Sequence, residues 1–194
     1  MNNMDKVKSV LFVGVGGQGT ILASKILTLG LLNNGYDVKM SEIHGMAQRG
    51  GSVSTQVRFG QKVYSPLIEK GTADVIVAFE KSEAARWLPY LKKDGYLVIN
   101  DYEIYPVPVL IGAEKYPEDV NAKLKATVSN TVIIDASEEA KKLGNIKAQN
   151  VVLLGALIKV LGLSSINWNK IIEQTVPAKA IELNKRALVK GMEA

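Results

Sequence analysis

The sequence contains no cysteine and only one histidine, His44, among its 194 residues. Without cysteine the chain can form no disulfide, and it offers no thiolate ligand to an iron–sulfur cluster. One histidine is too few for a zinc site unless carboxylates complete the ligand set, and no carboxylates are visibly spaced for that role. We therefore expect that this chain by itself binds no metal.

Long apolar runs are also missing. The longest, residues 151–158, is interrupted by Gly155 and is far shorter than the ~20 residues that span a bilayer. The first residues, 1–6, lack the apolar core of a secretion signal. We expect a protein that does not enter the membrane and works in the cytoplasm.

No internal repeat, low-complexity tract or Ser/Gly/Pro-rich linker divides the chain. A hydrophobic content of 47% is enough for one sizeable core, so we predict a single domain over residues 1–194.

The net charge is +5, but lysines are interleaved with acids along the chain, as in residues 138–142. That pattern is typical of a solvated helix face, with Ser137 as the expected N-cap, and not of a nucleic-acid-binding surface. A mildly basic surface could still assist the docking of an acidic partner.

The order of apolar segments predicts an α/β fold: a Rossmann-like, doubly wound, mostly parallel sheet with a β-hairpin insertion and a helical C-terminal part. The hairpin is expected from strands 53–59 and 62–68 around Gly60, and residues 105–110 are expected to form an edge strand because they contain two prolines. The other predicted strands are residues 7–13, 36–43, 73–79, 96–100 and 131–135. The predicted helices are residues 18–32, 81–91, 137–143, 148–161, 167–174 and 177–190.

The predicted helix 148–161 is apolar on nearly every side, which normally means burial on several sides. In so small a chain, part of that burial could come from another subunit. Trp87, Trp168 and residues 102–105 are candidate interface anchors for the same reason. The alternative, that these aromatic residues complete the chain's own core, is equally compatible with the sequence.

A glycine cluster follows the first predicted strand and precedes the first predicted helix. Strand, glycine turn and helix form the context in which backbone N–H groups at a helix start bind phosphate. A turn that needs glycine only for packing is the alternative. A dinucleotide site would also need an acidic residue ~20 residues further on, and Glu42 falls late for that role, so NAD is not the favoured ligand. The predicted cofactor-binding residues are Gly14, Gly16, Gly17, Gln18, Gly19 and Thr20.

A second glycine cluster, residues 42–52, combines a glutamate, the only histidine and an arginine with three glycines. It lies between two predicted strands, and polar loops in such positions often carry function. The arginine offers a planar set of donors to a carboxylate or phosphate. A glycine-rich connector with solvated side chains is the alternative. The predicted partner-binding or active-site residues are Glu42, His44, Gln48, Arg49, Gly50, Gly51 and Ser52.

Taken together, these clusters resemble the gamma-type subunits of the 2-oxoacid:ferredoxin oxidoreductases. The similar segments are residues 14–19, 41–53, 73–78 and 149–156, which span most of the chain. The first and third are common in α/β proteins, whereas the second is specific. Its His-Gly-Met-Ala-Gln-Arg-Gly-Gly sequence resembles the indolepyruvate, or arylpyruvate, branch more than the pyruvate and 2-oxoglutarate branches.

The resemblance implies a small subunit of an enzyme that decarboxylates a 2-oxoacid, transfers the acyl group to coenzyme A and reduces ferredoxin. It places thiamine diphosphate and the iron–sulfur clusters on a larger partner subunit, and it assigns neither of these cofactors nor a catalytic residue to this chain. The isolated chain is expected to be inactive and to form, at most, a homodimer. The other hypothesis is a free-standing nucleotide-binding module or an NAD-dependent dehydrogenase.

Overall fold

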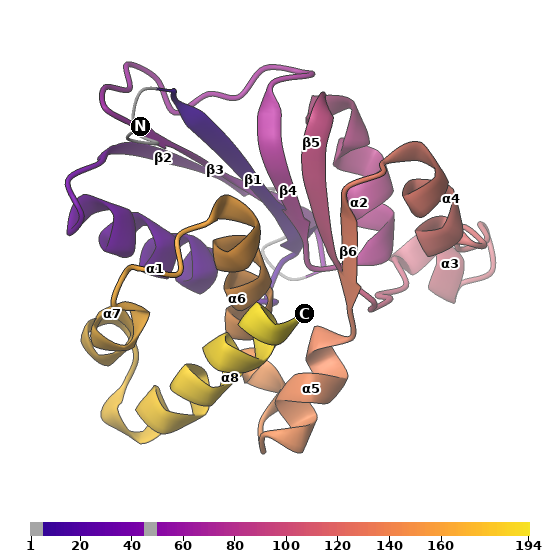
Figure 1. Cartoon of the computed structure of the whole chain (residues 1–194). Coiled ribbons are helices and arrows are strands. Elements are labelled where there is room, and N and C mark those ends of the chain that lie inside the picture. The colour runs from indigo at the N-terminus through magenta and orange to yellow at the C-terminus, as the bar shows by residue number, and fades with distance from the viewer. Residues whose placement is uncertain (1–5, 45–49) are drawn as a thin grey trace.

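A computed structural model describes residues 6–44 and 50–194. Within these residues the chain builds one sheet of six strands in the order β2-β3-β1-β4-β5-β6 (Figure 1). β1, β4, β5 and β6 pair in parallel, and β3 runs antiparallel to both of its neighbours, β1 and β2. The strands are β1 Lys8–Val15, β2 Asp37–His44, β3 Ser52–Gly60, β4 Ala73–Ala78, β5 Leu91–Asn100 and β6 Thr131–Ile134.

Helices cover both faces of this sheet. Helices α1, α5, α6, α7 and α8 lie on one face, and α2 and α4 lie on the other (Figure 1). The helices are α1 Thr20–Leu32, α2 Lys81–Trp87, α3 Val107–Leu110, α4 Val120–Thr127, α5 Ala136–Lys142, α6 Gln149–Leu161, α7 Trp168–Thr175 and α8 Ile181–Glu193. Short 3₁₀ turns at Leu88–Tyr90, Ile146–Ala148 and Ala178–Ala180 adjoin α2, α6 and α8. The predicted α/β class is confirmed.

The central strands are apolar on both sides because each side faces a helical layer. In β4, Val75 and Val77 belong to the larger core, beneath α1 and α6, whereas Ile76 and Ala78 belong to the smaller core, beneath α2 and α4. A parallel strand covered on both faces has this near-continuous apolar sequence.

Helix α6 is buried by the chain itself. Every residue from 149 to 158 is buried, with the sheet and α1 on one side and α8 on the other. The two helices approach closely at paired glycines: a Cβ on Gly191 would lie 1.8 Å from the Val152 carbonyl oxygen, and one on Gly155 would lie 2.3 Å from the Leu188 carbonyl oxygen. No second subunit is needed to explain the all-round apolar sequence of α6.

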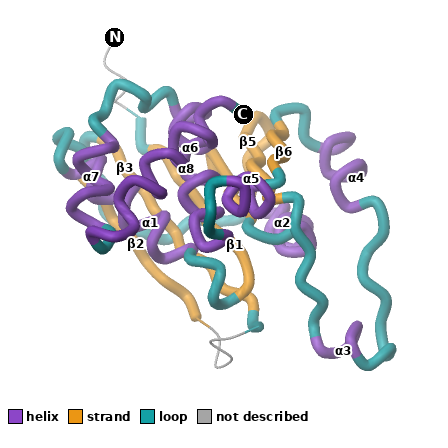
Figure 2. The backbone as a smooth tube through the Cα atoms, turned by 90° about the horizontal axis from the view of Figure 1, so that it is seen from below, coloured by secondary structure: helices purple, strands orange, loops and turns teal. Residues whose placement is uncertain are grey.

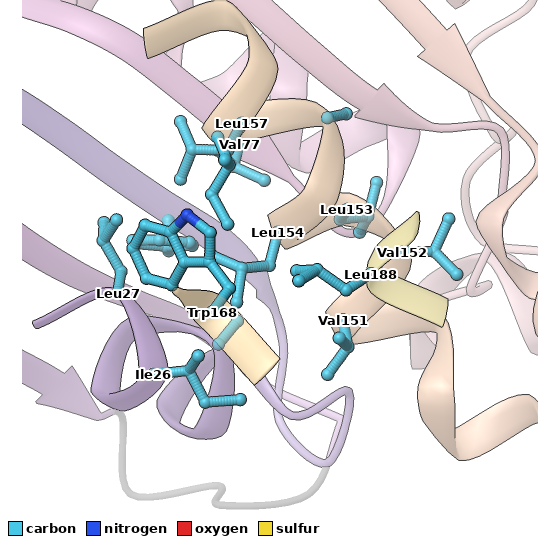
Figure 3. Close-up of a cluster of buried hydrophobic side chains, with 14 of the residues drawn as sticks. Ile26, Leu27, Val77, Val151, Val152, Leu153, Leu154, Leu157, Trp168 and Leu188 are labelled. Carbon is cyan, nitrogen blue, oxygen red and sulfur yellow. The ribbon is translucent and has the colours of Figure 1, made fainter. Parts of the chain in front are cut away.

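Trp168 also belongs to this chain's core. Its ring is 3% exposed and lies among side chains of α1 and α6 (Figure 3). It fills the space that a Cβ on Gly30 would occupy, at 2.2 Å, and its Nε1 donates to the Leu163 carbonyl. Trp87 is partly buried against the smaller core, so neither tryptophan is a free interface anchor.

The predicted hairpin of residues 53–59 with 62–68 is wrong. β3 pairs with β2 on one edge and β1 on the other, and residues 62–68 form no strand. Polar side chains of β3 hold this segment: Gln56 Oε1 accepts from the Ile68 N–H at 2.6 Å, and Arg58 donates to the carbonyls of Ser65 and Leu67. Side-chain contacts to the sheet face therefore replace the ladder expected from the sequence.

Three other local predictions were wrong. Residues 105–110 contain the short helix α3 instead of an edge strand, because Pro106 and Pro108 suit a first helical turn as well as an edge. α4 was not predicted. Asp135, not Ser137, caps α5: its carboxylate accepts from the Glu138 N–H at 2.8 Å.

Between β5 and α4 the chain makes a long excursion, residues 101–119, which we call the arm. It carries α3 near its far end and stands away from the helical layers (Figure 2). Its two limbs meet where the rings of Tyr105 and Tyr116 pack with centroids 5.2 Å apart. The arm is thus a projecting element with a closed base.

Candidate functional site

The two glycine clusters meet at the carboxyl edge of the parallel strands. β1 ends in the glycine turn, residues 14–19, and β3 begins at the same edge because Ser52 pairs with Val15. β2 ends there as well, since His44 pairs with Val53. In open α/β sheets this edge is the usual ligand-binding edge. The topology therefore brings together the two segments that the sequence singles out.

A hydrogen bond joins the clusters directly. The Gly16 N–H donates to the Gly51 carbonyl at 2.9 Å, so this amide is already engaged within the chain. The Ser52 hydroxyl donates to the buried carboxylate of Glu83 at 2.5 Å. That carboxylate also accepts from Arg86 Nε at 2.9 Å and Trp87 Nε1 at 3.2 Å, which fixes the start of β3 against α2.

Packing requires glycine at several positions of the turn. A Cβ on Gly14 would lie 2.9 Å from both Gln18 Oε1 and Phe79 Cβ. Gly19 has φ 85° and leaves room for Asn150, whose Nδ2 would be 2.5 Å from a Cβ there. Gly17 has φ 99° and open space around it, so its requirement is for backbone conformation alone.

Gln18 is a structural residue of the turn. Its side chain is 7% exposed; Oε1 accepts from the Val15 N–H and Nε2 donates to the Phe79 carbonyl, both at 2.8 Å. The same carbonyl accepts from Asn100 Nδ2 at 3.2 Å. Both ends of the Gln18 amide are thus occupied by backbone groups.

Asn100, at the end of β5, extends this network to α5 and α6. It is fully buried; Oδ1 accepts from the Ala136 N–H at 3.0 Å, and Nδ2 also donates to Ser137 Oγ and Gln149 Oε1. Ser137 Oγ donates to Gln149 Oε1 at 2.7 Å. A continuous set of buried hydrogen bonds therefore connects the carboxyl ends of β1, β4 and β5, and such satisfied networks make a site rigid.

Asn150 lies beside the glycine turn at the start of α6. Its Nδ2 donates to the Gly19 carbonyl at 3.2 Å. Its Oδ1 is buried and has no hydrogen-bond partner in the described part of the chain. The adjoining start of α1 has neither a side-chain cap nor an acidic residue in its first turn. These features leave one acceptor and several helix-start N–H groups at the edge, although Gly16 and Gln18 are engaged elsewhere.

Glu80 is a second buried carboxylate at this edge, and it anchors the arm. It caps α2 by accepting from the Glu83 N–H at 3.0 Å, and it accepts from the Tyr116 hydroxyl and, at 3.4 Å, from the Ile104 N–H. Burial, followed by this hydrogen bond to Glu80, raises the pKa of the Tyr116 hydroxyl well above its ordinary value. Nearby, Lys81 pairs with acidic residues of the arm at its base.

The Lys81 ammonium lies 2.8 Å from Asp101 and 2.9 Å from Glu103. Burial alone would lower the pKa of Lys81, but its hydrogen bonds to these two carboxylates outweigh burial and raise it. Lys81 also donates its backbone N–H to the Tyr102 carbonyl at 3.1 Å. These contacts hold the first limb of the arm against α2.

The predicted site residues divide into three groups. The glycine turn lies at the carboxyl edge, with Thr20 buried as the first residue of α1. Glu42 lies on β2 opposite Thr55, and Gly50, Gly51 and Ser52 lead into β3. Gln48 and Arg49 lie outside the described residues, as does the side chain of His44.

Sequence reasoning missed the buried polar residues that hold this edge together. Glu80 directly follows the buried segment ending at Phe79, and a polar residue after a parallel strand is a usable signal. Asn100 ends β5 in the same way. Glu83 carries no such signal, because it resembles an ordinary helix residue. Ser137 was predicted only as an N-cap, and Gln149 and Asn150 begin the similar segment 149–156 but were not assigned to the site.

The strand order argues against a dinucleotide site. β3 separates β2 from β1, so Glu42 lies two strand spacings, roughly 10 Å, from the strand that feeds the glycine turn. In dinucleotide-binding folds the corresponding acidic residue lies on the strand adjacent to β1.

Among the described residues no group of three or more His, Cys, Asp or Glu side chains could hold a metal ion. No described helix is long and apolar enough to cross a membrane.

The fold and this edge define an α/β protein whose glycine clusters meet at the usual ligand-binding edge of the sheet, and comparison with known proteins shows its class. Residues 9–194 match the family model described as pyruvate ferredoxin/flavodoxin oxidoreductase. The chain belongs to this family.

Individual relatives cover nearly the whole chain. It is 40% identical over 201 residues to the indolepyruvate oxidoreductase subunit IorB of Thermococcus kodakarensis, covering 97% of this chain and 96% of that protein. Identity to the pyruvate/ketoisovalerate oxidoreductases common subunit gamma of Pyrococcus furiosus is 28%, over 95% of each chain. The crystal structure of the keto/oxoacid ferredoxin oxidoreductase gamma subunit from Geobacter sulfurreducens has the same fold, with a TM-score of 0.71, 24% identity and 96% coverage of both chains.

Proposed function

We propose that this chain is the small subunit of an indolepyruvate ferredoxin oxidoreductase that acts in the cytoplasm. The whole complex decarboxylates an arylpyruvate, transfers the acyl group to coenzyme A and passes two electrons to ferredoxin. In this proposal residues 1–194 form one gamma-type domain. Thiamine diphosphate and the iron–sulfur clusters are held by the larger subunit.

The observation that carries the proposal is the junction of the two glycine clusters, formed by the bond from Gly16 to Gly51 at the carboxyl edge. The cluster that contains Gly51 is the segment whose sequence resembles the indolepyruvate branch. Identity supports the same branch, at 40% to an indolepyruvate oxidoreductase subunit and 28% to a pyruvate/ketoisovalerate subunit.

The composition supports this division of labour. The chain has no cysteine, so its residues do not fit an iron–sulfur cluster with thiolate ligands. At the carboxyl edge, buried hydrogen bonds link Gln18, Asn100 and Gln149 into a rigid surface, which we call the wall. A glycine-rich segment lies next to it, directly before β3 in the sequence. Such a wall can position a substrate or partner without taking part in electron transfer.

Within the wall, we assign the two predicted clusters different tasks. The glycine turn and the start of α1 contact the phosphates of coenzyme A, where the Gly17 position is open and helix-start N–H groups are present. Glu42, His44, Gln48, Arg49 and residues 50–52 contact the larger subunit or the acyl group. The engaged side chain of Gln18 supports the turn from within.

Reconstitution with the larger subunit tests the proposal. The chain is co-expressed with that subunit, and turnover of indolepyruvate, pyruvate and 2-oxoglutarate is measured with coenzyme A and ferredoxin. We expect the highest kcat/KM for indolepyruvate and no turnover by the isolated chain.

Two outcomes would contradict the proposal at different levels. A preference for pyruvate would reject the substrate while retaining the subunit class. A lone homodimer that binds NAD and associates with no larger subunit would support the nucleotide-binding alternative and reject the subunit class.

A further inference from the structure

We propose that Glu83 is a positioning residue: through Ser52 it holds residues 50–52, the end of the second glycine cluster, in the conformation that the reaction requires. The inference rests on the proposed function, because the reaction is that of the complex with the larger subunit. It adds to that function a residue of α2 that belongs to neither glycine cluster.

The Glu83 carboxylate is enclosed by its own chain. Its side chain is 4% exposed, so it contacts neither a ligand nor a partner subunit directly. It accepts from the Ser52 hydroxyl at 2.5 Å, from Arg86 Nε at 2.9 Å and from Trp87 Nε1 at 3.2 Å. A buried carboxylate that is paired with a cation and hydrogen-bonded in this way is fixed in place. Any effect of Glu83 on chemistry at the carboxyl edge therefore passes through one of these three groups.

Only one of the three donors belongs to a glycine cluster. Arg86 and Trp87 lie on α2 itself, whereas Ser52 is the first residue of β3. Ser52 is an exposed residue, yet its hydroxyl turns inward to the buried carboxylate. Most side-chain hydroxyls bond to backbone or water, so a bond from an exposed serine to a buried acid is a specific anchor. Ser52 is therefore the group through which Glu83 acts.

The same anchor lies beside the junction of the two glycine clusters. The Gly51 carbonyl, one residue before Ser52, accepts from the Gly16 N–H at 2.9 Å. Residues 51 and 52 are thus held at two adjacent points, by the glycine turn and by α2. Hydrogen bonds to a carboxylate are stronger than those between neutral groups, so the Glu83 contact contributes most to this attachment. Losing it should loosen the bond from Gly16 to Gly51.

The residues that Glu83 positions suit a small reacting group better than a subunit interface. Residues 50–52 are Gly, Gly and Ser, whereas the binding energy of protein interfaces comes mainly from aromatic and arginine side chains. Gly50 is exposed, and a Cβ there would meet no atom of the described residues within 4 Å, so its backbone is accessible. Backbone groups held in a fixed place can orient a substrate, and small errors of position lower the rate. We therefore assign the effect of Glu83 to turnover and not to assembly.

The test uses two variants that break the anchor, one that restores it and one matched control. Glu83→Gln removes the charge and Ser52→Ala removes the donor, whereas Ser52→Thr keeps the hydroxyl. The control is Asp74→Asn, near the start of β4 at the opposite edge of the sheet. The Asp74 side chain is 13% exposed, accepts from the Ser9 N–H at 2.8 Å and pairs with two lysines. It is thus a comparable acid without a link to either glycine cluster.

Hydrogen exchange on the free chain measures the positioning itself. The amide of Gly16 is the probe, because its N–H is the donor in the junction. We expect about tenfold faster exchange at Gly16 in Glu83→Gln and in Ser52→Ala, since a charge-assisted hydrogen bond next to the junction is weakened or lost. Ser52→Thr should recover most of the difference, and Asp74→Asn should leave exchange at Gly16 unchanged.

Kinetics of the complex with the larger subunit measure the consequence for the reaction. We expect kcat for indolepyruvate to fall about tenfold in Glu83→Gln and Ser52→Ala, with the dissociation constant of the complex within about threefold of wild type. Ser52→Thr should recover most of the rate. The control Asp74→Asn should lower thermal stability and leave kcat unchanged, which separates a positioning role from a structural one.

Three outcomes would count against these assignments. Unchanged exchange at Gly16 in both anchor variants would overturn the positioning role, and Ser52→Ala alone decides if Glu83→Gln does not fold. Weaker assembly with unchanged kcat would overturn the assignment to turnover. A wild-type complex that turns over no 2-oxoacid would instead reject the proposed function, while exchange at Gly16 would still decide whether Glu83 positions residues 50–52.

Discussion

Two segments of this chain are almost equally apolar, but one is buried and the other is exposed. Residues 151–158, in α6, are buried between the sheet and α8, whereas residues 104–111, in the arm, are largely exposed. α6 contains no proline and has a glycine that lets another helix approach. The arm has two prolines, which prevent a long helix or a central strand. Apolar composition alone therefore does not decide whether a segment is buried; the local backbone chemistry decides whether the segment can pack against its own chain.

The largest expected change in the free energy of unfolding comes from truncating a leucine in α6, and the same truncation in the arm is its comparison. Leu154→Ala removes a fully buried side chain and should lower the free energy of unfolding by about 3 kcal/mol. Leu110→Ala, at a residue 68% exposed, should change it by less than about 0.5 kcal/mol. Urea denaturation of the free chain measures both. A loss of similar size at Leu110 would mean that the arm folds onto this chain's core in solution.

A smaller effect is expected where α6 and α8 cross. Gly191→Ala places a methyl group against the Val152 carbonyl, so the helices must separate, at a cost of about 2 kcal/mol. Arg186→Ala, on the exposed side of α8, serves as the control and should stay within about 0.5 kcal/mol of wild type. If thermal unfolding showed equal stability for both variants, the close crossing would not be what buries α6.

The smallest expected change in stability comes from a substitution at the base of the arm. Tyr116→Phe removes the hydroxyl that donates to Glu80 and should cost about 1 kcal/mol, with faster amide hydrogen exchange at Ile104. Tyr105→Phe is the control, since its hydroxyl contacts an exposed carboxylate and its loss should leave stability nearly unchanged. Equal exchange at Ile104 in both variants would show that the Glu80 contact does not hold the arm.

The raised pKa of Tyr116 adds a pH dependence to this comparison. A folded-state pKa above the unfolded value means that the folded chain retains the phenolic proton more strongly. The corresponding stability is fully present below the unfolded pKa of about 10 and is lost as pH rises above that value. Wild type should therefore lose stability more steeply than Tyr116→Phe above pH 10. Parallel curves for the two proteins would contradict the assignment.

Much of this protein could be predicted from its sequence because the relevant signals are local. Glycine spacing after an apolar strand predicted the turn at residues 14–19, and apolar runs such as 73–78 predicted strands covered on both faces. The absence of cysteine excluded thiolate-bound clusters. The specific sequence of residues 41–53 indicated the family, whose model the chain matches. Each of these conclusions depends on residue types and short spacings alone.

Other features were decided by contacts between residues far apart in the chain. Gln18 resembles a ligand-binding residue in the sequence, but the Phe79 carbonyl, 61 positions away, occupies its amide. Residues 62–68 form no strand of the sheet, because β3 already pairs with β1 and β2, and Gln56 and Arg58 hold the segment through their side chains instead. Long-range hydrogen bonds and close packing leave no periodic mark in a sequence, and only the tertiary structure decides them.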